Sequence, residues 1–338
     1  MRRGIAIAGN IAVDEIKYID KYPAKSELTT IRNIDRNTGG IISNCGITLS
    51  RIDYNIPIEI ITLVGKDEKG DYLKETLSKY PNIIFNQVKA VGKTPFTDVI
   101  NDISDKSRTF FFFRGNSHLF NEDTIDLEKL NSKILHIGYI LLLDGLDEED
   151  EVYGTKMARL LKNAQEIGLK TSIDIVSENS NRFVDKVPPS LKYTDYCIIN
   201  EIEAGKSVNV NLRDANNRLI KENIRDVLYK LKKLGVKEWV IIHCPEGSFG
   251  YDGLNIYSVP SLFLEKEKIK GTVGAGDAYA AGALYGAHEG LSIEDSMKLA
   301  TSSAASLLLA EEGASGVKTY NELLKMFEEY PKHETITI

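Results

Sequence analysis

The stretch PIEIITLVGKDEKGDYLKETLSKY (residues 57–80) holds the repeating unit that decides the fold class. Its first nine residues form a nearly continuous apolar run, which is typical of a parallel strand covered on both faces. The following fifteen residues have the polar composition and the apolar spacing of a surface helix. Repetition of such a strand–helix unit along a chain predicts a parallel sheet covered by helices.

The same alternation extends in both directions from this unit. Before it lie the strand-like GIAIAGNI (4–11) and a segment with helical spacing, IISNCGITLSRI (41–52). After it, helical segments such as EVYGTKMARLLKNAQEIG (151–168) and IRDVLYKLKKLG (224–235) separate further strand-like runs. These runs are SKILHIGYI (132–140), LKTSIDIV (169–176), TDYCIIN (194–200) and EWVIIHC (238–244). The pattern predicts a three-layer, doubly wound α/β fold with a mostly parallel sheet.

Two segments interrupt the alternation with polar, strand-like pieces. Residues 14–37 contain EIKYID and LTTIRNID, and residues 94–117 contain FTDVIND and SRTFFFFRG. Together they predict a small β-sheet lid over a main domain made of residues 1–13, 38–93 and 118–338. Two separate surface hairpins without a shared role are the alternative, and the sequence leaves both open.

Composition excludes several classes of partner. The chain has 338 residues, a net charge of −7 and no Lys/Arg block, so we expect no nucleic-acid partner. No apolar run approaches the ~18–20 residues of a membrane span. The three cysteines, Cys45, Cys197 and Cys244, are far apart and odd in number, which fits a reducing cytoplasm rather than a disulfide framework. The scattered histidines and the lack of CxxC and HExxH predict no structural metal site.

The glycine-rich stretch GTVGAGDAYAAG (271–282) leads into a helix with a small-residue face. Unpaired amides at a helix N-terminus attract anions, and small residues let a phosphate approach the backbone. Asp277 begins this helix and has two interpretations: a capping or first-turn carboxylate, or a general base that takes a proton from a hydroxyl group. The loop alone leaves both open.

Two other nucleotide-binding patterns fail in this chain. The dinucleotide pattern that starts at Gly274 would put the bulky Tyr279 at its last position, which argues against an oxidoreductase. The Gly-Lys-Ser at Gly205 lacks the required P-loop glycine, because Asn200 stands in its place.

Five motifs, in order along nearly the whole chain, resemble those of the ribokinase-like (PfkB) carbohydrate kinases. They are GNIAVDEI (9–16), TGGIISNCGITLSRI (38–52), LVGKDEKGDYL (63–73), NEIEAG (200–205) and GTVGAGD (271–277). The resemblance implies the ribokinase-like fold and transfer of the γ-phosphoryl group of ATP to a hydroxymethyl group of a sugar or sugar acid. In the family pattern Asp277 is the general base, and the loop of Gly274, Ala275 and Gly276 is the anion hole.

The resemblance also implies an acceptor site made of Asp14, Gly39, Gly40 and Asn44, with Arg108 of the lid as a further contact. Asp14 as a turn cap, the glycine pair as a simple turn and Asn44 as a solvated helix residue are the alternatives. Arg108 has an ordinary surface position as its alternative, as does Arg114, which also lies in the predicted lid.

For the nucleotide, the resemblance implies contacts from Thr272, His243 and Gly247. Asn200 and Glu203 would order water bound to Mg²⁺, with Glu203 holding the metal through water. By themselves these two residues could equally be a capping pair at a helix start. The implied cofactors are therefore ATP and Mg²⁺.

The run Phe110–Phe113 puts aromatic rings on both faces of a lid strand. One face could cover substrate and the other the lid of a second copy, which gives a possible homodimer; a strand packed on the main domain is the alternative. The acidic stretch from Asp144 to Glu151 lacks the spacing of a calcium loop, and we expect a solvated helix start there.

The chain departs from the family pattern at two positions. Gly271 replaces an aspartate associated with a monovalent-cation site, which leaves potassium activation undecided, and Pro245 alters the nucleotide-side loop. Two other functions stay open: a nucleoside kinase of the same superfamily, and a sugar-sensing regulator that has lost activity.

Overall fold

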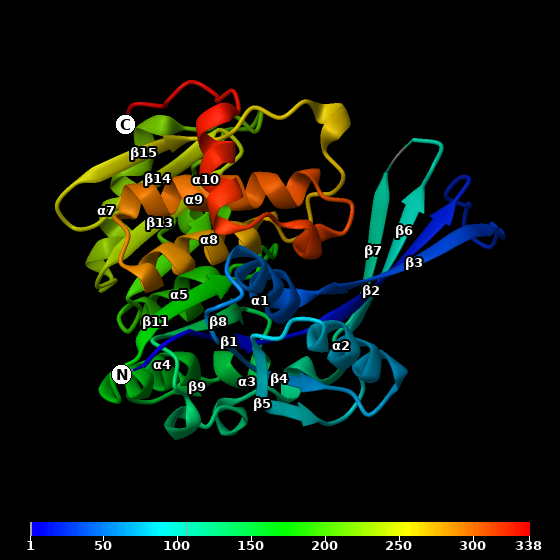
Figure 1. Cartoon of the computed structure of the whole chain (residues 1–338), viewed down its shortest axis with the longest axis horizontal. Coiled ribbons are helices and arrows are strands. Elements are labelled where there is room, and N and C mark those ends of the chain that lie inside the picture. The colour runs from blue at the N-terminus through cyan, green and yellow to red at the C-terminus, as the bar shows by residue number, and fades with distance from the viewer. Residues whose placement is uncertain (1, 106) are drawn as a thin grey trace.

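The computed structural model describes residues 2–105 and 107–338 and shows a large layered body with a small sheet projecting from it (Figure 1). Residues 1 and 106, which fall in the ranges predicted for the main domain and the lid, lie outside the described residues. Within the described part, nine strands form the central sheet. In spatial order they are β15 (Ile256–Pro260), β14 (Gly247–Tyr251), β13 (Trp239–Cys244), β12 (Tyr196–Asn200), β11 (Lys170–Ile175), β8 (Ile134–Ile140), β1 (Ile5–Gly9), β4 (Ile58–Val64) and β5 (Ile83–Ala90). The strands from β13 to β5 pair in parallel, and β14 and β15 are antiparallel, so the predicted mostly parallel sheet is confirmed.

Helices cover both faces of this sheet and bury one large core against each face. Ile5 and Ile7 of β1 belong to one core, while Ala6 and Ala8 belong to the other, because successive strand residues point to opposite faces. The first core is covered by α1 (Gly40–Ile52), α2 (Glu68–Ser78), α8 (Ala275–Glu289), α9 (Ile293–Leu309) and α10 (Tyr320–Glu329). The second is covered by α3 (Asp144–Asp147), α4 (Lys156–Glu166), α5 (Phe183–Leu191), α6 (Glu201–Ser207) and α7 (Ile224–Lys233). The three-layer, doubly wound prediction is therefore confirmed.

Short elements complete the body and shift one predicted boundary. The helix expected over residues 151–168 begins only at Lys156, because a small hairpin of β9 (Glu149–Asp150) and β10 (Gly154–Thr155) precedes it. Thr155 then caps the helix by accepting the N–H of Ala158. The 3-10 helices are η1 (Gly115–Leu119), η2 (Glu122–Thr124), η3 (Leu127–Lys129), η4 (Lys221–Asn223), η5 (Lys266–Lys268) and η6 (Gly313–Gly316).

The acidic stretch from Asp144 to Glu151 differs from the solvated helix start that its sequence predicts. Its helical part, α3, is a single short turn, and Asp147 at its end is only 5% exposed. Asp147 accepts the N–H of Leu141 at 3.2 Å, and burial raises its pKa to about 6. The expectation was wrong for this residue because chain folding places it under the neighbouring loop rather than in water.

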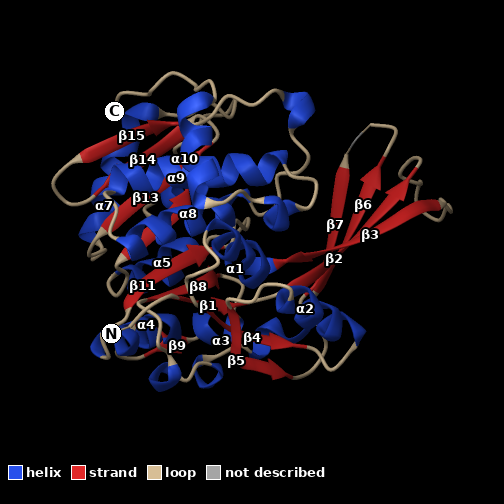
Figure 2. Ribbon diagram, in the orientation of Figure 1, coloured by secondary structure: helices blue, strands red, loops and turns tan. Residues whose placement is uncertain are grey.

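A separate sheet of four strands projects from the body (Figure 2). In spatial order it contains β3 (Ile31–Gly39), β2 (Ala12–Ile19), β6 (Phe96–Asp102) and β7 (Arg108–Phe113). β2 and β3 form one antiparallel pair and β6 and β7 another, and the two pairs join in parallel along β2 and β6. The predicted small sheet is confirmed, and the alternative of two independent hairpins is wrong.

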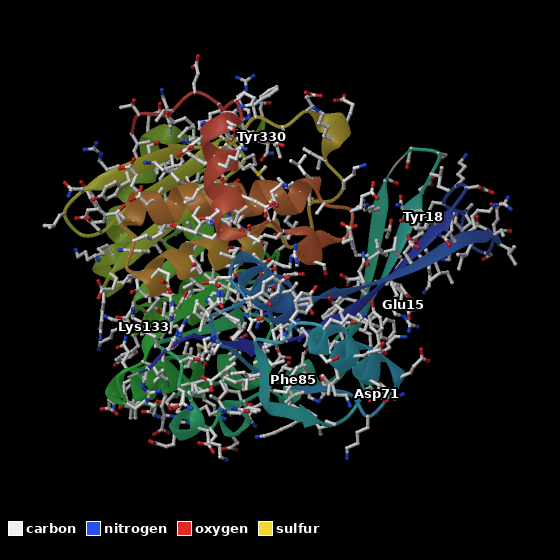
Figure 3. All side chains as sticks on the ribbon, viewed as in Figure 1. Glu15, Tyr18, Asp71, Phe85, Lys133 and Tyr330 are labelled. Atoms are coloured by element: carbon white, nitrogen blue, oxygen red, sulfur yellow. The ribbon has the colours of Figure 1, made fainter. Side chains whose placement is uncertain are left out.

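Strand alternation gives this sheet two different faces. Asp14, Ile16 and Tyr18 of β2 share the face that lines a large cavity. Glu15 lies on the opposite face and accepts a hydrogen bond from Nζ of Lys69 in α2 at 2.6 Å, which ties the base of the sheet to the body. Figure 3 labels Glu15 and Tyr18 on this strand.

The phenylalanines of edge strand β7 are largely uncovered. Phe110–Phe113 are between 42% and 54% exposed, and the ring of Phe113 lies 5.2 Å from that of Phe96 within the same sheet. Packing of this strand on the main domain would have buried these rings, so that alternative is wrong. Arg114, directly after β7, pairs with Asp144 at 2.7 Å in an exposed position, as the surface alternative predicted.

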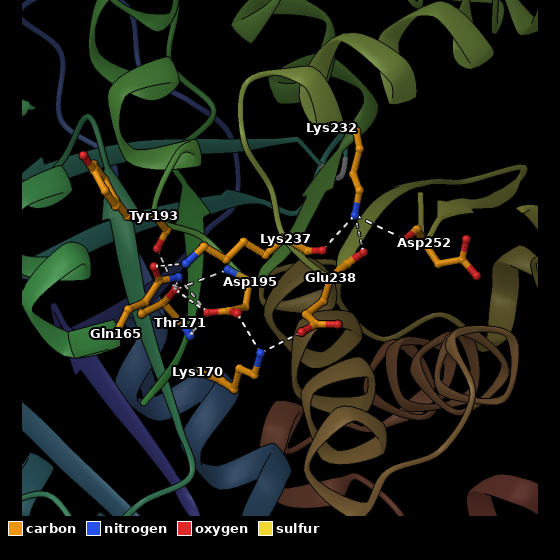
Figure 4. Close-up of polar contacts among 9 residues, drawn as sticks. All are labelled: Gln165, Lys170, Thr171, Tyr193, Asp195, Lys232, Lys237, Glu238 and Asp252. Atoms are coloured by element: carbon orange, nitrogen blue, oxygen red, sulfur yellow. Dashed lines mark hydrogen bonds and ion pairs between the residues drawn. The ribbon is translucent and has the colours of Figure 1, made fainter. Parts of the chain in front are cut away.

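Polar side chains join the amino ends of β11, β12 and β13 (Figure 4). Asp195, which is 2% exposed, accepts the N–H of Thr171 at 2.9 Å and Nζ of Lys170 at 3.0 Å. Lys170 also contacts Glu238 at 2.6 Å. These contacts link the three strands to one another. They lie at the opposite ends of the strands from the glycine loop and are therefore separate from the candidate site.

Two expectations from composition concern membranes and cysteines. In the part of the chain that the structure describes, no helix is long and apolar enough to cross a membrane. Cys45 and Cys197 are buried and Cys244 is half-buried, and all three are free thiols.

Candidate active site

The carboxyl ends of four neighbouring strands bring polar side chains to one edge of the sheet. Tyr139 of β8, Asp174 of β11, Asn200 of β12 and His243 of β13 stand at the last or next-to-last position of their strands. This edge is where open parallel sheets bind ligands. The first turn of α8 lies against it, since Asp277 contacts Tyr139 directly.

The glycine loop leads into α8 with a conformation that requires glycine. Gly274 is the N-cap residue at φ +82°, and a Cβ there would lie 2.9 Å from the side chain of Asn44. The amides of Gly276 and Asp277 donate to no acceptor within the described residues, whereas the N–H of Ala275 makes only a long 3.4 Å contact. Free amides at a helix N-terminus form a site for an anion.

Asp277 is held by donors from two other elements rather than capping its own helix. Nδ2 of Asn44 in α1 donates to Oδ2 at 2.9 Å, and the hydroxyl of Tyr139 donates to Oδ1 at 2.8 Å. Asp277 is 7% exposed, and burial raises its pKa to about 6, while the hydrogen bonds from Asn44 and Tyr139 act in the opposite direction. A carboxylate with this pKa is ionised near neutral pH and is basic enough to accept a proton.

A second buried carboxyl group, Asp174, shares a hydrogen bond with Asp277. Its Oδ1 also accepts the N–H of Ile175 at 2.7 Å. Burial and the negative charge of Asp277 raise the pKa of Asp174 well above its usual range. Sequence reasoning assigned no role to Tyr139 or Asp174. Each is a polar residue near the carboxyl end of an apolar strand, and that position is the signal that could have found them.

Asn200 and Glu203 form a capping box at the start of α6, as the alternative interpretation had it. Oδ1 of Asn200 accepts the N–H of Glu203 at 2.9 Å, and the carboxylate of Glu203 accepts the N–H of Asn200 at 3.0 Å. Glu203 is only 4% exposed, and burial raises its pKa to about 7. A cap that is this deeply buried differs from the solvated pair that usually starts a surface helix.

The same edge concentrates buried carboxyl groups, which bears on whether it suits a metal ion. Asp174, Glu203 and Asp277 are all buried, and no lysine or arginine contributes to the pKa shift of any of them. Within the described residues no three such side chains converge as a direct ligand set. Oxygen donors with uncompensated charge but no closed ligand cage fit Mg²⁺ held through water.

A cavity of about 610 Å³ lies between the small sheet and the body. Three residues of the expected acceptor site line it: Asp14 and Arg108 of the sheet and Asn44 of α1. Asp277 does not line the cavity. It lies behind Asn44, which lines the cavity and donates a hydrogen bond to Asp277.

The predicted glycine pair supports this cavity from behind. A Cβ at Gly39 would lie 2.7 Å from Oδ2 of Asp14, so glycine leaves the space that this carboxylate occupies. Gly40 has φ +82°, and a Cβ there would lie 2.7 Å from the carbonyl oxygen of Asn10, where β3 turns into α1. Burial raises the pKa of Asp14, against the effect of a hydrogen bond with Thr97.

A second cavity of about 550 Å³ lies on the other side of the glycine loop. The ring of His243 stacks on Tyr279 with centroids 4.6 Å apart, and burial lowers the pKa of His243 to about 4. His243 is therefore a neutral, flat wall rather than a cation. Glu203 is absent from the lining. The predicted nucleotide-binding residues that do line the cavity are Asn200, His243, Gly247 and Thr272.

The glycine loop is the wall that the two cavities share. Gly271 and Val273 line the first cavity, whereas Thr272, Ala275 and Gly276 line the second. The loop therefore faces both cavities.

The sequence matches the family model described as pfkB family carbohydrate kinase over residues 4–319. The chain belongs to the pfkB family of carbohydrate kinases. Enzymes of this family are phosphotransferases with an alcohol group as acceptor, and the curated relatives of this pfkB chain are named as kinases.

Several relatives match nearly the whole chain of this pfkB family member, and two of them illustrate the range. It is 24% identical over 319 residues to the ribokinase of Lactococcus lactis subsp. lactis (strain IL1403), with 92% of each chain covered. It is 19% identical over 330 residues to the nucleoside kinase of Methanocaldococcus jannaschii, with 96% of this chain and 97% of that protein covered.

Solved structures show the same fold. The Arabidopsis thaliana ribokinase complexed with ribose and ATP aligns with a TM-score of 0.77 at 18% identity, over 97% of this chain and 99% of that one. The nucleoside kinase of M. jannaschii aligns with a TM-score of 0.74, over 97% and 98%. The ribokinase-like fold expected from the motifs is thereby confirmed.

Proposed function

We propose that this pfkB family kinase transfers the γ-phosphoryl group of ATP to a hydroxymethyl group of a sugar or sugar acid. The observation that carries the proposal is the glycine loop as the common wall of two cavities, with Asp277 directly behind it. ATP in the second cavity would place its γ-phosphate at the free amides of the loop. An acceptor in the first cavity would place its hydroxyl group on the other side of the same wall.

The acceptor would be oriented by the residues that line the first cavity. Asp14 and Asn44 carry hydrogen-bonding groups suited to sugar hydroxyls. Arg108 adds a positive charge on the lid side, which supports a sugar acid as well as a neutral sugar. Closure of the lid over the acceptor would exclude water from the reacting groups.

The chemical step needs one base and one anion hole. The hydroxyl proton passes to a carboxylate oxygen of Asp277 while the hydroxyl oxygen bonds to the γ-phosphorus, and the bond from that phosphorus to the ADP oxygen breaks. Amides of Ala275 and Gly276, with Gly274 permitting the turn, stabilise the charge of the transferring group. Because Asp277 is 7% exposed, the hydroxyl group must displace a present donor to reach its carboxylate.

Magnesium, when bound, supplies positive charge that neutralises the phosphate oxygens. Asn200 and Glu203 are the residues that would hold it through water. Burial raises the pKa of Glu203 to about 7, so its carboxyl group is only partly ionised at neutral pH. A nearby cation would favour the ionised form.

The base assignment is tested by the variant Asp277→Asn. We expect its turnover to fall by about 10²–10⁴-fold because general-base catalysis contributes that much. Steady-state ATP consumption measures turnover, and a circular dichroism spectrum equal to wild type shows that the fold is intact. Asp226→Asn, on α7, is the matched control and should keep wild-type turnover. Near-normal turnover in the purified Asp277→Asn protein would refute the assignment.

A nucleoside kinase is the second candidate, and one feature of the first cavity favours it. Tyr18, Tyr72 and Phe110 line this cavity of about 610 Å³ and could stack on a base. ATP consumption with D-ribose, D-fructose, 2-keto-3-deoxygluconate and adenosine as acceptors separates the candidates. Turnover with a sugar or sugar acid supports the proposal, turnover with adenosine alone supports the nucleoside kinase, and binding without turnover supports a sensing regulator.

A further inference from the structure

Residues 331–338, which we call the strap, run beside the second cavity along a fixed path. The strap starts after Tyr330, at the end of α10 (Figure 3), and continues in red to the side of β15 (Figure 1). The N–H of Phe263 donates to the carbonyl of Pro331 at 2.8 Å, and the N–H of His333 donates to the carbonyl of Ser261 at 3.0 Å. These bonds form a short antiparallel bridge, so the backbone of His333 is held against the cavity rim.

The far half of the strap is anchored independently. The hydroxyl of Ser258 donates to the carbonyl of Ile336 at 2.6 Å, and Nη2 of Arg225 donates to the carbonyl oxygen of Ile338 at 2.7 Å. The side chains of Ile336 and Ile338 pack against one of the two buried cores. The strap is thus fixed at both ends without any ligand.

His333 is the strap residue that lines the second cavity. Its ring lies 5.4 Å from that of Phe263, at an angle of 55°, and the residue is exposed. Leu262, Leu264 and Leu308 line the same cavity. A flat ring beside apolar side chains forms a surface on which another flat ring can pack.

The position of the glycine loop at one end of the second cavity indicates which part of a nucleotide would contact His333. If the phosphates of ATP lie at the amides of Ala275 and Gly276, the nucleoside must fill the remaining space. That space is bounded by the neutral ring of His243, the leucines and His333. We propose that the strap forms part of the nucleotide site and that the ring of His333 packs against the nucleoside of bound ATP or ADP. This inference rests on the proposed function.

Calorimetric titration of the full chain with two probes tests the inference. ADP carries a nucleoside, whereas inorganic tripolyphosphate occupies only the loop. His333→Ala should weaken ADP binding by about tenfold, equivalent to ~1.4 kcal/mol, because the variant loses the stacking of a ring on the base. Tripolyphosphate binding should stay unchanged in the same variant. Glu334→Ala, a neighbour on the strap that does not line the cavity, is the matched control and should bind both probes as wild type does.

The outcomes separate the strap from the proposed function. Wild-type affinity for ADP in His333→Ala overturns the inference, and so does an equal loss for ADP and tripolyphosphate, which indicates a general disturbance of the cavity. His333→Phe keeps a flat ring and should retain ADP affinity; a loss equal to that of His333→Ala also overturns ring packing. Failure of the wild-type protein to bind ADP at all overturns the proposed function together with the strap's role.

Discussion

Asp277 accepts hydrogen bonds from an amide and a phenol while lying almost entirely out of water. Burial disfavours its charged form, and both donors favour it. The two effects leave the pKa of Asp277 at about 6, above that of a free carboxyl group and in the range that suits a general base. In the proposed mechanism, Tyr139 is therefore a positioning residue that acts through Asp277.

This balance predicts the acid limb of the pH profile. Because Asp277 must be ionised to accept a proton, kcat/KM should fall as the pH drops below about 6. Tyr139→Phe removes a donor that lowers the pKa of Asp277, so the limb should move to higher pH by about one unit. Values of kcat/KM measured over about pH 5–9 with the same substrates give the shift of the acid limb between the two proteins.

The control for this profile is Tyr251→Phe, which removes a hydroxyl that donates to the carbonyl of Gly253 away from the site. Its acid limb should coincide with that of wild type. A Tyr139→Phe limb that coincides with wild type, or that moves to lower pH, contradicts the role assigned to Tyr139.

Residues in motifs with fixed spacing could be placed from sequence, and isolated ones could not. Asp14, Asn44 and Asp277 stand in stretches that match the family pattern, and the structure brings the last two into contact. Tyr139 and Asp174 each stand alone at a strand end, where no spacing marks them. Their proximity depends on the order of strands in the sheet, which the sequence does not state.

At the scale of elements, the strand–helix alternation was enough to predict the body because each unit buries its own apolar face. The strap was not predictable in this way. Its strand-like alternation covers only Thr335–Ile338, which is too short to predict an element, and its path depends on distant partners such as Arg225 and Ser258. The junction of β3 with α1 was predictable only in part. The sequence shows the glycine pair, but it does not show that Gly39 leaves space for the carboxylate of Asp14.

The close approach of Asp14 to Gly39 predicts the effect of Gly39→Ala. Gly39 has extended backbone angles, so alanine is tolerated by the backbone, but its Cβ would lie 2.7 Å from Oδ2 of Asp14. The carboxylate must move, and KM for the acceptor should rise by about tenfold or more, equivalent to ~1.4 kcal/mol. Steady-state kinetics with varied acceptor at saturating ATP measures the change.

Gly46→Ala, in the middle of α1, serves as the matched control. The nearest atom to its Cβ is in Ile60 at 4.0 Å, an ordinary contact, and alanine favours the helix. This control should keep the wild-type KM with equal or higher thermal stability. An unchanged KM in Gly39→Ala would show that Asp14 does not set acceptor affinity.

At the scale of the whole molecule, the first cavity belongs to neither part alone. Asp14 and Arg108 come from the projecting sheet, whereas Asn44 and Gly271 come from the body. An acceptor that contacts both parts binds more tightly when they approach each other, so binding itself favours closure. The second cavity is lined by the body and the strap, and it does not need the projecting sheet.

This division predicts where hydrogen exchange responds to each ligand. Saturation with the acceptor of highest turnover should slow amide exchange in the four lid strands by about tenfold. With acceptor bound, local opening of these strands must also break their contacts with the acceptor. ADP alone should protect the segment from Leu262 to Gly276 and leave the lid strands unchanged. Peptides from α7 (Ile224–Lys233) should be insensitive to the acceptor and report on global stability. If lid exchange stays unchanged while calorimetry shows the acceptor bound, the projecting sheet is not a lid.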